Sequence, residues 1–108
     1  MRRIVITGMG AVSPLGASVA TSWSRLLAGR SGIRSLPAEM VGDLPAKVGG
    51  TVPSLQEDPE AGFDPDTVLA PKEQRRADRF IVFALAAAEE ALAQAGWKPV
   101  SDDDRART

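Results

Sequence analysis

A β-branched run opens the pattern of apolar positions along the chain. Ile4, Val5 and Ile6 follow one another without a polar residue, and Gly8 ends the run soon afterwards. An unbroken apolar run of this length, closed by glycine, is typical of a strand that is covered on both faces. The sequence therefore predicts a buried strand over residues 3–8.

An amphipathic helix is predicted next, over residues 19–28. Its apolar residues recur at the α-helical period, so they form one stripe. That stripe consists of Val19, Trp23, Leu26 and Leu27. Ser18 suits the N-cap, and Gly29 suits the left-handed position that follows the last turn. The chain is thus expected to open with a strand, a turn and a helix.

A longer helix is predicted over residues 72–95. Pro71 suits its first position, and Gly96 marks its end. At about 100° per residue, small and aliphatic residues fall on one arc, which we expect to be the packing face. The arc consists of Ala77, Ile81, Ala84, Leu85, Ala88, Ala91, Leu92 and Ala95. Its alanines predict that another element approaches the helix closely.

The region between the helices, residues 31–70, is rich in glycine and proline and has one candidate short strand at residues 46–52. A stretch this long is uncommon inside a compact domain unless it is functional or supported by other parts of a protein. The polar tail "SDDDRART" shows no packing pattern. A strand buried on both faces needs neighbours on both edges, which these elements do not supply. We therefore expect an α/β chain that is the N-terminal portion of a larger fold.

The composition narrows the chemistry that the chain can perform. Its 108 residues allow one small domain, and its net charge of -1 argues against a dedicated binder of nucleic acid or membrane surfaces. Cysteine and histidine are both absent, which excludes a disulfide framework, the usual zinc sites and Ser-His or Cys-His relays. We find neither a signal peptide nor an apolar run that could span a membrane, so a soluble cytoplasmic protein is expected.

Two other motifs yield no convincing site. The glycines of "TGMGAVSPLG" follow a strand and precede a helix, but Ser13 stands where a dinucleotide-binding fingerprint needs its third glycine, and Pro14 follows it. Ser13 is expected to be a turn residue. Glu89 and Glu90 are expected on the exposed side of the second helix, without a partner for acid-base chemistry.

A cluster of basic residues stands out because its like charges do not stabilise the helix that contains them. Lys72, Arg75, Arg76 and Arg79 have the spacing i, i+3, i+4, i+7, so a continuous helix would place them on one outward face. Like charges at i, i+4 destabilise a helix slightly, by about 0.2 to 0.5 kcal/mol per pair. Such a face is either simply solvated or a docking surface, and arginine favours carboxylate or phosphate partners.

Three stretches together resemble one family. They are "RRIVITGMGAVSPLG", "SWSRLLAGRSGI" and "FDPDTVLAPKEQRRADRF", and they occur in that family's order and spacing. With them the chain resembles the N-terminal part of a β-ketoacyl-[acyl carrier protein] synthase, the condensing enzyme of fatty-acid elongation. The resemblance covers most of residues 2–97 and matches loosely over residues 36–62.

The resemblance implies a thiolase-like layered αβαβα fold, incomplete in this chain, and usually a homodimer. Members of the family accept an acyl group on a cysteine, decarboxylate malonyl-[acyl carrier protein] with the help of two histidines, and condense the two. No cofactor is implied, because phosphopantetheine arrives on the acyl carrier protein. The basic residues of the "KEQRR"-like stretch contact the acidic helix of that carrier, which assigns docking to Lys72, Arg75 and Arg76. Arg79 would extend the same face.

Two alternatives stay open at this point. A polyketide ketosynthase, or its cysteine-less chain-length partner, shares these stretches, and a non-catalytic module could use the basic residues for docking alone. Because the catalytic cysteine and histidines of the family have no counterpart here, we expect the 108-residue chain alone to be inactive.

Overall fold

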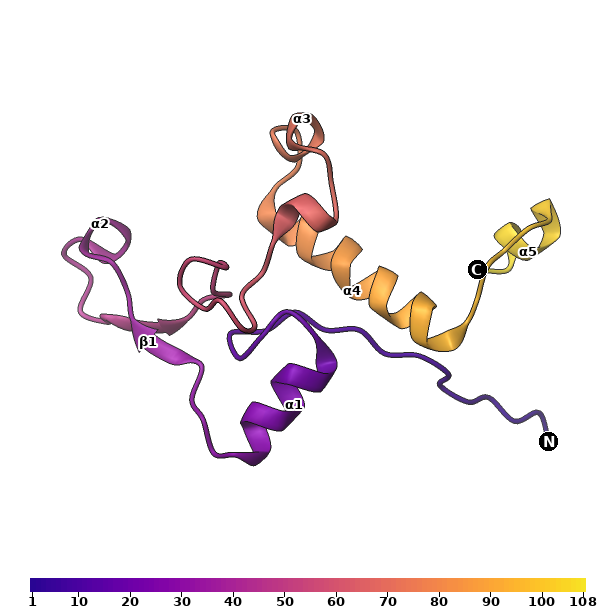
Figure 1. Cartoon of the computed structure of the whole chain (residues 1–108), viewed down its shortest axis with the longest axis horizontal. Helices are drawn as coiled ribbons and strands as arrows, with labels where there is room; N and C mark the ends of the chain where they lie inside the picture. Colours follow the sequence, from indigo (N-terminus) through magenta and orange to yellow (C-terminus); the bar gives the residue numbers. More distant parts are fainter.

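The computed structural model describes residues 1–108 as an open arrangement of short elements around one long helix (Figure 1). Its radius of gyration is 17.0 Å, whereas a compact domain of this length has a value of about 13 Å. The elements in chain order are α1 (Val19–Leu27), β1 (Ile33–Ser35), α2 (Ala38–Val41), β2 (Val48–Gly50), the 3-10 helix η1 (Pro65–Thr67), α3 (Pro71–Gln74), α4 (Arg79–Ala95) and α5 (Asp102–Ala106).

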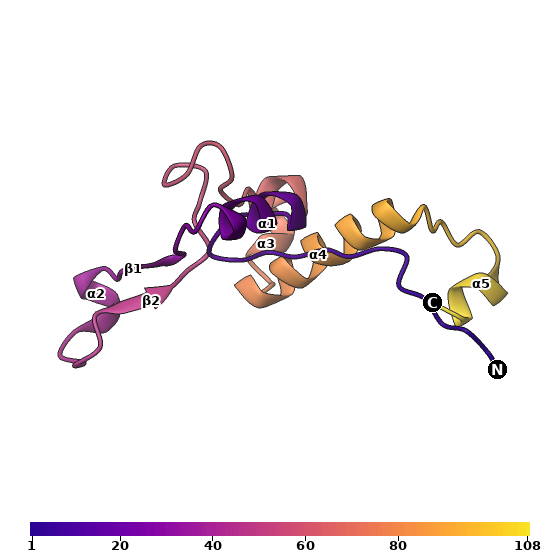
Figure 2. The same cartoon turned by 90° about the horizontal axis from the view of Figure 1, so that it is seen from below.

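The first twelve residues contain no paired strand, so the strand predicted over residues 3–8 is absent from this structure. Ile4, Val5 and Ile6 are 91%, 70% and 84% exposed. The segment is extended and runs beside α4 (Figure 2), but no other segment offers a backbone edge to it. A β-branched run fixes a preference for extended backbone, whereas a strand also requires a hydrogen-bonding neighbour.

Helix α1 matches the helix expected over residues 19–28, with Ala28 as its C-cap. The side chain of Ser18 accepts a hydrogen bond from the Thr21 amide at 3.2 Å. A second hydrogen bond caps the first turn of α1, because a carboxylate oxygen of Glu90 in α4 accepts a hydrogen bond from the Val19 amide at 2.9 Å. The other carboxylate oxygen of Glu90 accepts from the Ala11 amide at 3.0 Å. Glu90 is therefore half-buried and structural, and its predicted exposed position was wrong.

Two glycines allow the N-terminal segment to lie directly on α4. A Cβ atom at Gly8 would overlap the Ala91 carbonyl, and one at Gly10 would overlap the Ala87 carbonyl. The Gln94 side chain also accepts a hydrogen bond from the Met9 amide at 2.6 Å. The close approach expected of the alanines is therefore present, and glycine is the residue that permits it.

The predicted arc of α4 packs only in part, because Ala91 and Ala95 of the arc meet the N-terminal segment at Gly8. Val82 is 6% exposed, whereas Ile81, Leu85 and Leu92 of the arc are 39% to 40% exposed. These larger side chains of the arc stay uncovered in this structure. Ala91 and Ala95 of the arc, together with Ala87 beside it, carry the contacts because small side chains let the extended segment reach the helix backbone.

The region 31–70 contains a small antiparallel sheet, in which β1 pairs with β2 so that Ile33 lies opposite Gly50. Strand β2 falls within the candidate strand at residues 46–52. The few buried apolar side chains outside this sheet are Val41 of α2, Pro53, Ala61 and Phe63 of the following loop, and Val82 of α4. Helices with a small sheet make this a partial α/β fold, in agreement with the class expected from the sequence.

An ion pair fastens the loop at residues 54–63 to α1. Arg25, 8% exposed, donates from Nη1 to Asp58 Oδ2 and from Nη2 to Asp58 Oδ1 at 3.2 Å. Its Nη1 also donates to the Leu15 carbonyl at 2.9 Å. The hydrogen bond from Arg25 lowers the pKa of Asp58 to about 2, although desolvation acts in the opposite direction. Nothing in the sequence pattern pointed to this pair, because its partners are 33 residues apart.

The tail forms α5, which the sequence pattern did not indicate. Ser101 and Asp104 make a reciprocal capping box, and the Trp97 indole donates to the Thr108 hydroxyl at 2.9 Å. The whole chain exposes 8429 Å², whereas a folded monomer of 11.4 kDa exposes about 5,800 Å². The difference reflects uncovered apolar faces on the N-terminal segment, α1 and α4. None of the helices is both long and apolar enough to cross a bilayer.

Candidate functional site

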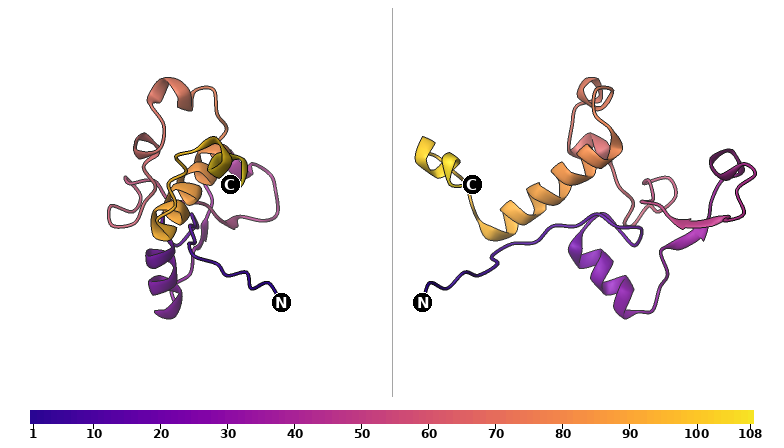
Figure 3. Two further views of the ribbon diagram at one scale, coloured as in Figure 1. Left: turned by 90° about the vertical axis from the view of Figure 1, so that its right-hand side faces the viewer. Right: turned by 180° about the vertical axis from the view of Figure 1, so that it is seen from behind.

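Helix α3 stands at the tip of a protrusion above α4, which Figures 1 and 3 show from different sides. We call residues 71–77 the protrusion. Ala70 is extended, with φ -60° and ψ 146°, and Pro71 then supplies the fixed φ of a first helical residue. The Gln74 side chain anchors the base, because its Nε2 donates to Asp66 Oδ1 and to the Leu69 carbonyl, each at 2.7 Å.

The predicted continuous helix over residues 72–95 is broken after the protrusion. Asp78 has φ -67° and ψ 156°, which is extended backbone, and α4 begins at Arg79. The Arg76 and Ala77 amides bond to the Glu73 and Gln74 carbonyls at 3.0 and 3.2 Å, so the chain turns tightly before it extends. Aspartate is favoured at an N-cap, which makes Asp78 a start signal inside what reads as one periodic segment.

The break leaves three of the four basic residues together. Lys72, Arg75 and Arg76 are exposed on the protrusion, and none of them forms an ion pair in the structure. They lie within five consecutive residues on one short protrusion, so their charges are close together. The three predicted docking residues are therefore neighbours that are exposed and form no ion pair within this chain.

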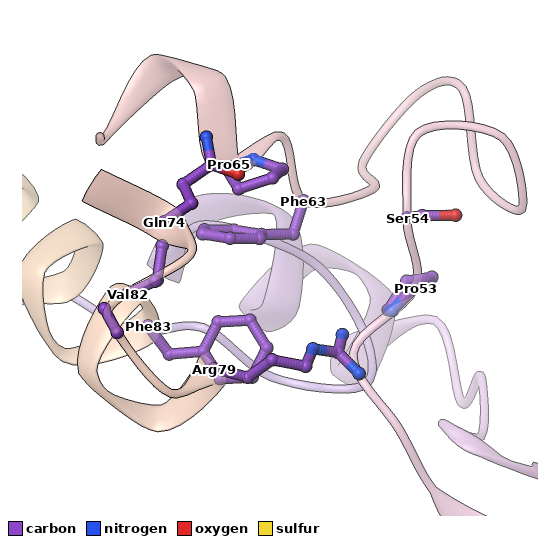
Figure 4. A pocket seen from close by; sticks show the side chains of 9 residues that line it. Pro53, Ser54, Phe63, Pro65, Gln74, Arg79, Val82 and Phe83 are labelled. Atoms are coloured by element: carbon purple, nitrogen blue, oxygen red, sulfur yellow. The ribbon is translucent and has the colours of Figure 1, made fainter. Parts of the chain in front are cut away.

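Arg79 does not extend their face, so that part of the prediction was wrong. It belongs to α4, and its guanidinium carbon lies 5.1 Å from the centre of the Phe83 ring, a cation-π contact. One guanidinium nitrogen also donates to the Val52 carbonyl at 3.4 Å. Figure 4 shows Arg79 between Phe83 and Pro53, at the edge of a cavity.

That cavity has a volume of about 230 Å³ and lies between the protrusion, α4 and the loop at residues 53–65. The Phe63 and Phe83 rings form one wall, with centroids 4.9 Å apart and an interplanar angle of 81°. Gln74 of the protrusion forms another part of the lining (Figure 4), and Ala77 also lines the cavity. No pattern in the sequence predicts this cavity, because its lining comes from segments that become neighbours only on folding.

A carboxylate lies near the Arg79 side of the cavity. The Ser54 amide and hydroxyl donate to Glu57 Oε2 at 2.8 and 3.0 Å, and these bonds lower the pKa of Glu57. The positive charges of Arg34 and Arg79 add to that lowering. The charge of Arg79 is therefore partly balanced from within the chain, in contrast to the three residues of the protrusion.

The other candidate groups form no reactive arrangement. Ser13 lies in a turn, where its hydroxyl accepts from the Leu15 amide at 3.1 Å and contacts the Ser22 hydroxyl at 2.6 Å. No group of three or more histidine, cysteine or carboxylate side chains is placed to hold a metal ion. The candidate groups that stand out on this chain are therefore three exposed, unpaired cations beside the cavity.

This α/β chain with its basic protrusion belongs to the β-ketoacyl synthase family. The family model for the β-ketoacyl synthase N-terminal domain matches residues 1–108. The chain is 50% identical over its full length to 3-oxoacyl-[acyl-carrier-protein] synthase 2 of Rhizobium meliloti. It is 36% identical over 106 residues, 98% of the chain, to the protein of the same name from Vibrio cholerae.

A relative with polyketide in its name is similar at the same level. The putative polyketide beta-ketoacyl synthase 2 of Streptomyces halstedii is 36% identical over 91 residues, which is 84% of the chain and 20% of that protein. The chain covers 25% of the Rhizobium protein and 23% of the Vibrio protein. It therefore spans about a quarter of the length of the curated relatives that it matches.

Proposed function

We propose that this chain is the N-terminal portion of a 3-oxoacyl-[acyl carrier protein] synthase, which condenses acyl groups with malonyl-[acyl carrier protein] in fatty-acid elongation. The observation that carries the proposal is the 50% identity to a synthase of that name over all 108 residues. Within the protein, the chain supplies scaffold for the layered fold and part of the surface on which the carrier docks. It needs no cofactor of its own, since phosphopantetheine arrives on the carrier.

Docking on the protrusion is supported by charge. Lys72, Arg75 and Arg76 are exposed and unpaired, and a carrier with an acidic helix offers the carboxylates that guanidinium groups bind best. Opposite charges on two surfaces raise the rate at which they meet and fix their relative orientation. The protrusion reaches away from the rest of the chain (Figures 1 and 3), so none of these 108 residues stands between it and a helical partner.

Catalysis in this proposal depends on residues outside the 108 described here. The chain contains no cysteine and no histidine, so it holds neither the acyl-accepting thiol nor the decarboxylating imidazoles of the family. The uncovered faces of α1 and α4 are suited to burial against the remainder of the fold and, in a homodimer, against a second copy. A cytoplasmic location stays a prediction, and two relatives carry the word mitochondrial in their names.

Charge reversal tests the docking role. In the full-length protein, the triple variant K72E/R75E/R76E should bind acyl carrier protein at least about tenfold more weakly, and wild-type binding should weaken as salt is raised. Isothermal titration calorimetry at several salt concentrations measures both effects. The matched control K98E/R105E/R107E makes the same change in net charge on exposed residues of the C-terminal segment. Equal affinity of the docking triple and the wild type would show that the carrier does not use the protrusion.

A polyketide synthase is the second candidate, favoured by the Streptomyces relative. Both candidates share the protrusion, so the two are separated by the carrier that they accept. Condensation assays of the full-length protein, with fatty-acid and polyketide carrier proteins in parallel, distinguish them. Turnover confined to the polyketide carrier would contradict the leading proposal.

A further inference from the structure

The cavity beside the protrusion is the strongest feature that docking by charge alone leaves unexplained. We propose that it receives one apolar side chain of the carrier protein that binds Lys72, Arg75 and Arg76. This inference rests on the proposed function, because it takes the carrier as the docking partner. It adds an apolar anchor to a recognition surface that is otherwise purely electrostatic.

The chemistry of the cavity favours an apolar occupant. Phe63, Phe83, Val82 and Pro53 supply aromatic and aliphatic walls. The amide nitrogen of Gln74 is already committed to two acceptors outside the cavity, and the guanidinium of Arg79 rests on the Phe83 ring. Few free donors or acceptors therefore remain to compensate a polar or charged ligand for its lost hydration.

The size of the cavity admits a side chain. A protein cavity of about 150 Å³ lined by Leu, Ile and Phe is known to hold benzene. The present cavity, at about 230 Å³, has room for a branched aliphatic or methionine side chain. Filling it replaces exposed aromatic surface with close packing, which is the source of affinity at most protein interfaces.

The position of the cavity beside the basic residues favours the carrier protein as the source of the apolar side chain. Gln74 and Ala77 line the cavity, while Arg75 and Arg76, which lie between them in the sequence, are exposed. Residues 74–77 thus contribute to the lining of the cavity through Gln74 and Ala77 and present free positive charge through Arg75 and Arg76. Interfaces have this anatomy, with an anchor in a pocket and polar groups at the rim. A partner that is acidic and also offers an apolar side chain matches both halves.

The variant Ala77→Met tests the anchor, because methionine adapts to irregular gaps and would fill the cavity from within. In the full-length protein, A77M should bind acyl carrier protein at least about tenfold more weakly, a difference that corresponds to about 1.4 kcal/mol. The negative heat-capacity change of binding should become smaller, since it reports buried apolar surface. The salt dependence should stay as in the wild type, because no charge is altered. Ala70→Met makes the same substitution at an exposed position of the loop leading to the protrusion and should bind normally.

The outcomes separate this inference from the docking proposal. If K72E/R75E/R76E weakens binding but A77M binds with wild-type affinity and heat-capacity change, the anchor is wrong and electrostatic docking stands. If the charge reversal has no effect, docking on the protrusion is wrong and the anchor fails with it. A fall in the thermal midpoint of A77M, or a change in its oligomeric mass, would assign the cavity to another part of the chain or to a second copy and overturn the inference.

Discussion

The environment of Phe63 allows a quantitative prediction about the core. Phe63 is 8% exposed and packs edge-on against Phe83, and its amide donates to the Pro53 carbonyl at 2.7 Å. Replacing it with alanine removes a buried ring beside an existing cavity of about 230 Å³, so the two spaces would merge. Truncations of buried phenylalanine cost about 3 to 5 kcal/mol, and an aromatic pair adds about 0.5 to 1.5 kcal/mol to simple burial. We therefore expect F63A to lower the local free energy of opening by about 3 to 5 kcal/mol.

Native-state hydrogen exchange on the full-length protein measures this loss locally. The amides to follow are those of Phe63 and of Gly62, which donates to the Asp58 carbonyl at 2.7 Å. Phe63→Leu keeps most of the apolar volume and should cost less than about 1.5 kcal/mol. The variant Phe80→Ala, at a side chain that is 69% exposed here, shows the effect of the same truncation outside this core. A loss below about 1 kcal/mol in F63A would refute the reasoning, because it would mean that the Phe63 site is not a core in the intact protein.

Two further predictions concern single contacts. Gly10→Ala places a methyl group against the Ala87 carbonyl. We expect it to lower the free energy of unfolding, measured with urea, by about 1 to 3 kcal/mol, a cost typical of overpacking. Unchanged stability would mean that the N-terminal segment does not lie on α4. The pKa of Asp58 is lowered from 3.8 to about 2, so its pairing with Arg25 stabilises the folded state fully above pH 3.8, and this contribution is lost as pH falls through about 2. Thermal melts should therefore show the wild type ahead of Asp58→Asn at pH 5 and the two converging near pH 2, whereas a constant difference would contradict the assignment.

The features that depend only on neighbouring residues were predicted correctly from the sequence. The stripe and caps of α1 need only neighbouring residues, so the helix falls within one residue of its predicted end. The basic residues of the protrusion were also found from the sequence, because their exposure follows from their charge. The family resemblance rested on stretches whose match was then confirmed over all 108 residues.

The errors arose where distant segments or a single backbone angle decide the outcome. Periodicity cannot reveal that Asp78 becomes extended, since the residues on both sides continue the helical pattern, and this one residue separates Arg79 from the other cations. The packing face of α4 depends on which segment reaches it, and the glycines of the N-terminal segment lie on Ala87, Ala91 and Ala95 while the larger side chains of the predicted arc stay uncovered. The ion pair between Arg25 and Asp58, like the cavity, joins residues that only the folded chain brings together.

The bare N-terminal segment has a consequence for how the protein is made. Ile4, Val5 and Ile6 are almost fully exposed in this structure, and the relatives of this chain are about four times its length. At a synthesis rate of about 5 to 20 residues per second, a ribosome needs tens of seconds to deliver the remainder of a chain of that length. Throughout that interval the β-branched run is an unpaired edge, the kind of surface that pairs with other nascent chains. Production of this protein in cells should therefore depend on chaperones that occupy the run until its own neighbours have been translated.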